Sequence, residues 1–166
     1  IFFLVATTIN VDTGIGMTLP PKLKDNQEPP PVKDRNMLKV LVNSKGDVLI
    51  EEKPSSVNQV RKEVKKHVQN NGSNPDYAVN ADKAVVSIKT AQQTPYDKYI
   101  DVLDEAWLAY FQMWDVAAQQ RGYDDYDAFK NENPTDPGQK NAIRKKLPAQ
   151  ISIAEPGRGA GGGGSG

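Results

Sequence analysis

Acidic side chains are the residues of this sequence most able to do chemistry, and they lie in two clusters. Asp101 is followed by Asp104 and Glu105, and residues 124–127 contain three aspartates. Neighbouring carboxylates can act as a general acid and base, but on an exposed helix face they usually serve only to solvate the surface. The second cluster also lacks the spacing and the distal glutamate of an EF-hand loop. We therefore expect neither a catalytic pair nor a calcium site here.

The other groups that could carry catalysis are sparse. The chain has one histidine, His67, and no cysteine, and it contains no Gly-rich phosphate loop, nucleophile elbow or His-Glu-x-x-His motif. Trp107, Tyr110, Phe111 and Trp114 recur at helical spacing, which is more typical of a packed core with a docking face than of a cofactor site. We expect a protein that acts by binding, with no enzymatic activity, no cofactor and no metal.

The composition limits the size of the fold and the kind of partner. The chain of 166 residues suits one domain, and its 25% charged against 37% hydrophobic residues indicate that part of it is linker or loop. Twenty-one basic and 21 acidic residues give a net charge of zero. A neutral chain offers no electrostatic reason to bind nucleic acid.

The first 36 residues differ in character from the rest. Residues 1–6 are all apolar, which fits either a buried strand or the end of a membrane helix, and we predict that residues 1–9 are the end of a transmembrane helix. Residues 10–36 contain five prolines and are predicted to form an extended linker. Within the linker, residues 15–19 alternate like a short edge strand ended by Pro20. At the other end, the glycine-rich residues 157–166 are predicted to be a flexible tail that is partly an engineered linker.

Residues 37–156 carry the periodic patterns of a folded domain. The predicted elements are strands at 38–42 and 48–51, a helix from 56 to 69, a strand at 84–89, a long helix from 94 to 121, short helices at 123–129 and 139–147, and a strand at 149–154. This order predicts an α+β fold: a small mixed β-sheet with two main helices on one face, and a helical insertion at 109–147 before the last strand.

Three local signals set the expected boundaries of these elements. Gly46 is expected to take positive φ in the turn between the first two strands. Ser56 with Gln59 fits a capping box at the start of the first helix. Thr94 is expected to be the N-cap of the long helix, with Pro95 at its first position.

Five passages together resemble the ExbD/TolR family. They are the helix end at residues 2–8, the Leu-Pro step at 17–20, the hairpin at 40–50, the strand that leads into a Pro-Tyr helix start at 87–104, and the last strand at 150–153. The resemblance covers most of residues 1–108 and 148–155. Gln92 and Gln93 stand where the family usually has an acidic residue. The additional residues 109–147 are similar to those of ExbD-like proteins of the Bacteroidota.

The resemblance implies a subunit of an inner-membrane motor driven by the proton-motive force. Its partners would be an ExbB-like pentameric channel, a second ExbD-like copy and a TonB-like protein that opens outer-membrane transporters. The chain would cross the inner membrane once, with this domain in the periplasm and the proton-carrying aspartate upstream of Ile1. The alternative implied by the same resemblance is a TolR-like subunit that maintains the envelope by binding peptidoglycan.

Partner binding or dimerisation is expected at two places, the linker strand and the start of the long helix. The candidate residues are Ile15, Met17, Leu19, Pro20, Pro95 and Tyr96. Two other classes stay open: a flagellar-type stator, which usually carries a larger peptidoglycan-binding domain, and an unrelated secreted binding module, in which residues 1–6 would be a strand of the sheet.

Overall fold

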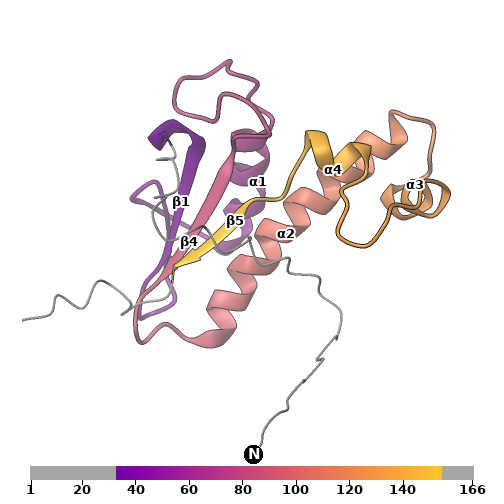
Figure 1. Cartoon of the computed structure of the whole chain (residues 1–166). Helices are drawn as coiled ribbons and strands as arrows, with labels where there is room; N and C mark the ends of the chain where they lie inside the picture. Colours follow the sequence, from indigo (N-terminus) through magenta and orange to yellow (C-terminus); the bar gives the residue numbers. More distant parts are fainter. Residues whose placement is uncertain (1–32, 155–166) are drawn as a thin grey trace, which may run out of the picture.

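The computed structural model describes residues 33–154 (Figure 1). The predicted membrane-helix end, the linker strand and the tail therefore lie outside the described residues. The elements are η1 (Asp34–Asn36), β1 (Met37–Val42), β2 (Val48–Ile50), β3 (Lys53–Ser55), α1 (Val57–Val68), β4 (Val85–Thr90), α2 (Tyr96–Gln119), α3 (Tyr126–Glu132), α4 (Ala142–Lys146) and β5 (Ile151–Ala154).

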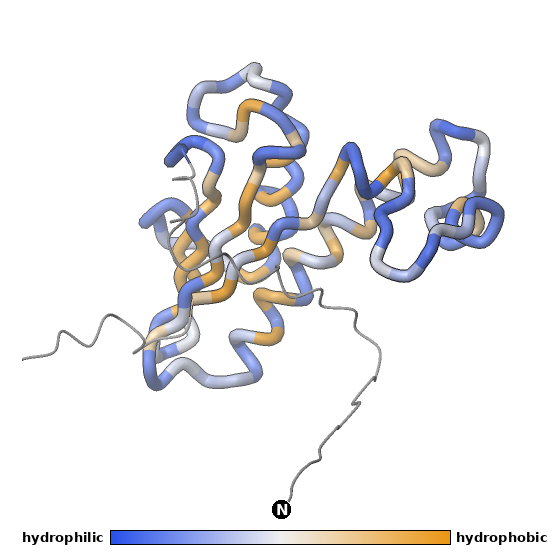
Figure 2. The backbone as a smooth tube through the Cα atoms, viewed as in Figure 1, coloured by the Kyte–Doolittle hydropathy of each residue, from blue (hydrophilic) through white to orange (hydrophobic). Residues whose placement is uncertain are grey.

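The strands form one mixed five-stranded sheet in the order β3-β2-β1-β4-β5. β1 pairs antiparallel with β2 and parallel with β4, and β5 runs parallel to β4. In β1 the buried residues alternate, with Leu38, Val40 and Val42 turned toward the helices. α1 and α2 pack together on that face (Figure 1), and Figure 2 shows apolar residues running along the strands and along α2. The predicted α+β architecture is confirmed.

The hairpin turn follows the predicted chemistry. Gly46 has φ of 86°, a conformation that costs other residues energy because of their Cβ. The side chain of Asn43 organises the same turn, since its Oδ1 accepts hydrogen bonds from the backbone N–H groups of Lys45 (2.9 Å) and Asp47 (2.8 Å). A Cβ at position 46 would also come within 2.8 Å of Lys98 Cγ on α2. The turn is therefore fitted to the start of the long helix.

Neither Ser56 nor Thr94 makes the side-chain capping bond that was predicted for it. Ser56 occupies the N-cap position of α1, but its side chain makes no capping bond. The hydroxyl of Thr94 accepts from the N–H of Ala91 (2.8 Å) and donates toward the carbonyl of Val42 (3.0 Å). Thr94 thus ties the loop before α2 to the end of β1, and α2 begins only at Tyr96, with Pro95 as its N-cap.

Strand β3 was not expected from the sequence. The chain reverses direction after β2 through Glu51 and Glu52, whose φ angles are 50° and 65°. These are left-handed conformations normally signalled by glycine or asparagine. No such residue marks this turn, and the three residues of β3 lie just before the helix predicted from residue 56.

The segment after α2 packs against the second half of that helix and is part of the same core. Trp114 Nε1 donates to the carbonyl of Leu147 (2.8 Å), and Asp115 accepts from the N–H of Tyr126 (3.0 Å). The amide of Asn141 donates to the hydroxyl of Tyr126 (2.8 Å). Buried polar groups that are paired in this way fix the geometry of their surroundings. α3 and α4 are therefore anchored to α2.

Strand β1 is preceded by a hydrogen-bonded anchor, η1, which lies within the residues assigned to the linker. His67 of α1 is 1% exposed, and its Nε2 lies 2.9 Å from the carbonyl oxygen of Asn36. Because a carbonyl only accepts, Nε2 is the donor. The side-chain oxygen of Asn36 accepts from the N–H of Val79 (3.1 Å), and Arg35 donates to the carbonyl of Tyr77. The entry of the chain into the sheet is thus held by α1 and by the loop before β4.

We expect the domain to become less stable in mild acid, because His67 in this anchor is then protonated. Burial lowers the pKa of His67 from its ordinary value of 6.5, with the Asn36 carbonyl and Glu51 opposing the shift. The neutral form is favoured in the fold, so stability is full above the ordinary pKa and falls as the pH drops below it, by at most about 1.4 kcal/mol per pH unit for one proton. Denaturant midpoints at about pH 7.5 and about pH 5.5 measure the effect. Since His67 is the only histidine, His67→Gln should flatten the dependence; an equal loss in both proteins would contradict this assignment.

Candidate partner-binding surface

The two outer strands of the sheet differ in whether they can accept another strand. The N–H of Glu51 donates to the carbonyl of Lys39 (2.9 Å). Because hydrogen-bonded pairs alternate along an antiparallel ladder, the backbone N–H and C=O of Leu49 face β1, and those of Val48 and Ile50 face β3. Pro54, opposite Leu49, therefore points its backbone outward. Since proline has no N–H, the outer edge of β3 lacks the donor that a further strand would need.

Strand β5 presents the opposite edge with its donors intact. The N–H of Val86 donates to the carbonyl of Gln150 (2.8 Å), so the backbone groups of Gln150 and Ser152 face β4. The N–H and C=O groups of Ile151 and Ile153 point away from the sheet. No strand within residues 33–154 pairs with this side of β5. It is the edge to which an extended polypeptide can add.

An apolar stripe runs along one flank of α2, the long helix that follows β4. Tyr96, Ile100, Trp107 and Phe111 share one flank of the helix, with Tyr96 75% and Phe111 47% exposed. The rings of Trp107 and Phe111 lie 6.1 Å apart between centroids. The stripe is apolar but only partly buried by the domain itself.

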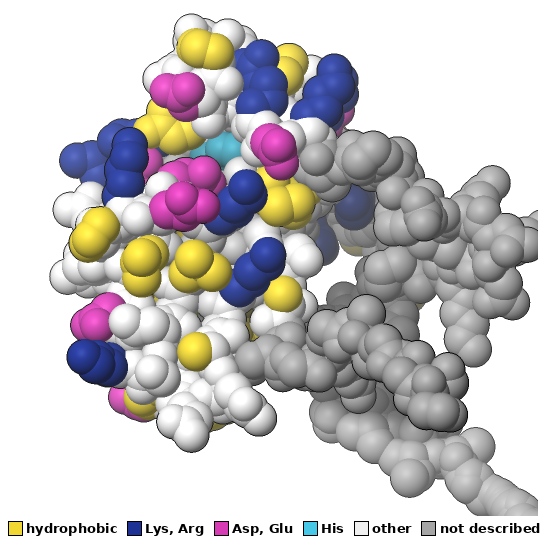
Figure 3. Space-filling view, turned by 90° about the vertical axis from the view of Figure 1, so that its left-hand side faces the viewer, with side chains coloured by type: hydrophobic (Ala, Val, Ile, Leu, Met, Phe, Trp, Pro, Cys, Tyr) yellow, Lys and Arg dark blue, Asp and Glu magenta, His cyan; other side chains and the backbone are white. Residues whose placement is uncertain are grey.

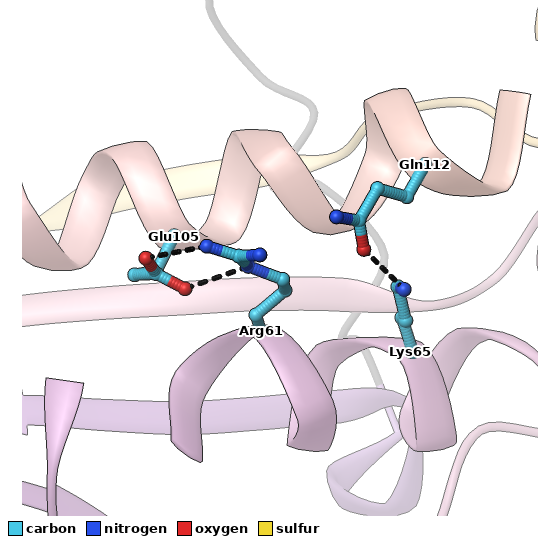
Figure 4. Close-up of polar contacts among 4 residues, drawn as sticks. All are labelled: Arg61, Lys65, Glu105 and Gln112. Atoms are coloured by element: carbon cyan, nitrogen blue, oxygen red, sulfur yellow. Dashed lines mark hydrogen bonds and ion pairs between the residues drawn. The ribbon is translucent and has the colours of Figure 1, made fainter. Parts of the chain in front are cut away.

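The opposite flank of α2 makes two polar contacts with α1, as Figure 4 shows. Arg61 of α1 donates two hydrogen bonds of 2.8 Å to the carboxylate of Glu105, and Lys65 contacts the side-chain oxygen of Gln112. A bidentate arginine–carboxylate pair fixes the rotation of one helix against the other. Because Glu105 and Gln112 lie on the opposite flank of the helix, the stripe of α2 faces away from α1.

We call Ile100, Trp107, Phe111, Ile151 and Ile153 the β5 edge surface. The side chains of Ile151 and Ile153 lie on the helix-covered side of the sheet, in register with Val86 and Ile88, and Ile153 is 39% exposed. The surface therefore combines unpaired backbone groups, which give affinity to an added strand, with apolar side chains that discriminate between sequences.

Only part of the predicted site can be placed. Tyr96 lies at the start of the α2 stripe, and Pro95 caps the helix next to it. Ile15, Met17, Leu19 and Pro20 lie outside the described residues. Ile151 and Ile153 were missed as site residues. The alternation at 149–154 signalled a strand there, but not which of its residues turn their backbone outward.

A groove lies at the other end of the sheet, beside β3. It is an open groove of about 1060 Å³ between η1, the turn after β2, the start of α1 and the loop at 75–77. Its lining mixes charged and hydroxyl groups, among them Lys39, Ser56, Glu63 and Tyr77. Figure 3, which views the molecule from the left of Figure 1, shows apolar side chains scattered among charges of both signs. The groove offers hydrogen bonds without a dominant charge.

Residues 33–154 lack both a cluster of metal ligands and a helix that could span a membrane. They contain no group of three or more histidine, cysteine, aspartate or glutamate residues placed to hold a metal ion. No helix in the same residues is long and apolar enough to cross a membrane.

Comparison with known families places the chain. The family model described as "Biopolymer transport protein ExbD/TolR" matches residues 1–120, which is most of the 166 residues. The chain belongs to the ExbD/TolR family. No curated protein matches it. Members of the family are anchored in the inner membrane, help to energise biopolymer transport and work with ExbB/TolQ-type and TonB/TolA-type partners. The match ends just after α2, so α3, α4 and β5 of this ExbD/TolR domain lie beyond it.

Proposed function

We propose that this chain is the periplasmic part of an ExbD-like subunit that uses the proton-motive force to energise TonB-dependent outer-membrane transport. The observation that carries the proposal is the β5 edge surface. A subunit that transmits force must bind its partner firmly. The β5 edge surface offers unpaired strand backbone and exposed apolar side chains for such binding. Backbone pairing gives a grip along the strand that depends little on any single side chain.

The proposed arrangement extends to the membrane and to a second copy. Residues 1–9 would end a single transmembrane helix inside an ExbB-like channel, with the proton-carrying aspartate further upstream. Residues 10–36 would carry motion to η1, which the buried contact between His67 and Asn36 fixes to the domain. Residues 15–19 would pair across a homodimer. These assignments rest on family membership and on the sequence of residues 1–36.

A TolR-like role is the second candidate, and the groove beside β3 is the observation that favours it. Its hydroxyl and amide groups, including those of Ser55, Gln59 and Tyr77, suit a glycan or peptide of the cell wall. Retention of the protein on purified peptidoglycan, reduced by Gln59→Ala, is the result that this role requires.

Co-purification from membranes tests the proposal. Two copies of the full-length protein with different tags are expressed together, and one tag is captured. The expected result is recovery of a multi-helix ExbB-like protein, a TonB-like protein and the second tag. Recovery of a TolA-like protein with peptidoglycan fragments would instead support the TolR-like role. Absence of any multi-helix membrane protein would contradict both roles.

A further inference from the structure

Arg144 of α4 adjoins the β5 edge surface. Its guanidinium carbon lies 5.4 Å from the ring centroid of Trp114, a distance at which a cation is attracted by an aromatic face. Trp114 in turn meets Phe111 edge to face, with 5.4 Å between the ring centroids. A continuous contact therefore runs from the apolar stripe of α2 to a positive charge.

Within the described part of the chain, this charge has no anion as its partner. Among residues 33–154 the ion pairs involve Arg61, Lys66, Lys98 and Lys130, and none involves Arg144. Its Nε is buried and has no hydrogen-bond partner among the same residues. Guanidinium groups at partly buried positions usually bind a carboxylate through two parallel hydrogen bonds. Because Nε is buried, a carboxylate from another molecule would meet the terminal nitrogens of Arg144, a residue that is partly exposed.

The segment of the chain that carries Arg144 has charges of one sign. Residues 137–154, which include α4 and β5, contain Lys140, Arg144, Lys145 and Lys146 and no aspartate or glutamate. Lys145 and Lys146 are exposed. The chain passes from α4 directly into the start of β5 (Figure 1). The cations are thus gathered at the amino-terminal end of the edge to which a strand can add.

We propose that α4 selects the partner strand by its charge: the β5 edge surface takes an extended segment of another protein whose apolar residues alternate and whose end beside α4 carries aspartate or glutamate. The inference rests on the proposed strand pairing and adds its sequence preference. Backbone pairing accepts many sequences, whereas complementary charge at one end sets register and excludes wrong partners. Because α4 lies beyond residues 1–120, this selection is a feature of the chain outside its family match.

Peptide binding tests the charge preference directly. The probes are fluorescent ten-residue peptides, blocked at both ends, that alternate valine and threonine and carry two glutamates at either the amino or the carboxyl end. Matched probes carry two glutamines instead. The glutamate peptide whose charged end lies beside α4 is expected to bind about tenfold more tightly than the matching glutamine peptide. This difference in affinity should shrink as the salt concentration rises.

Variants separate a direct role of Arg144 from a structural one. Arg144→Gln should remove the preference for glutamate while leaving binding of the glutamine peptide unchanged. Lys145→Gln with Lys146→Gln, which changes only exposed side chains, should reduce the preference in part, and Lys62→Gln on α1 is the matched control that should retain it. A folded Arg144→Gln variant that weakens both peptides equally, or equal affinity of the native protein for both, would overturn the charge selection alone. Failure of every peptide to bind would overturn the strand pairing as well.

Discussion

Replacing Ile153 by proline is expected to abolish partner binding while leaving the domain folded. The N–H of Ile153 points away from the sheet, so its loss removes no bond between β5 and β4. An added strand would lose a hydrogen bond and meet the proline ring at the centre of the edge. We expect binding of the TonB-like partner to fall at least about tenfold, as for loss of a central backbone contact with its steric fit. Growth that depends on energised transport, and capture of the partner from membranes, measure the effect.

Two control variants separate the effect of the outward N–H from effects on the side chain and on the fold. Ile153→Val keeps the N–H and most of the apolar side chain, and it should bind normally. Ser152→Pro removes an N–H that faces β4, so it should lower the thermal midpoint of the domain even without any partner. If Ile153→Pro supported transport as well as the native protein, β5 would not be the pairing edge.

Replacing Trp114 by alanine is expected to cause the largest loss of stability. Trp114 is 3% exposed, contacts the rings of Tyr110, Phe111 and Tyr126, and donates a hydrogen bond to the carbonyl of Leu147. Truncating a buried tryptophan typically costs about 3–5 kcal/mol. Because Trp114 joins α2 to both α3 and α4, loss of its side chain should also detach α3 and α4 from α2. The free energy of unfolding, obtained from chemical denaturation followed by circular dichroism, measures this cost.

The controls for Trp114 separate packing from hydrogen bonding. Trp114→Phe keeps much of the ring contact and loses the bond to Leu147, so a cost of about 1 kcal/mol is expected. Phe111→Ala removes a neighbouring aromatic side chain that is 47% exposed, and it should weaken partner binding more than folding. If Trp114→Ala lowered the free energy of unfolding by less than about 1 kcal/mol, the packing of α3 and α4 on α2 would not stabilise the domain as described.

The parts of the fold that were predictable are those in which local pattern and tertiary packing agree. The turn at Gly46 carries its own signal, and the alternation in β1 and β4 follows from burial on one side of the sheet. Tyr110 and Trp114 recur at helical spacing in α2 because that face of the helix packs on the core. β3 could not be predicted, because its position depends on Glu51 and Glu52 adopting positive φ without a local residue that favours it.

The site was less predictable than the fold, because it depends on register. The sequence placed a strand at 149–154, but whether Ile153 or Ser152 turns its backbone outward is fixed only by the bond between Val86 and Gln150. Thr94 shows the same limit, since a typical capping residue is used instead to tie two elements together. Arg144 gave no local signal, as its place beside Trp114 follows from how α4 packs.

Photocrosslinking from position 153 tests the central claim most directly. A photoreactive amino acid replaces Ile153 in the full-length protein, and cells are illuminated while transport is energised; the same group at Lys62, on α1, is the control. We predict a crosslink from position 153 to a TonB-like protein that is lost when an unlabelled strand peptide competes, and none from position 62. Crosslinking of that partner from position 62 but not from 153 would contradict the account.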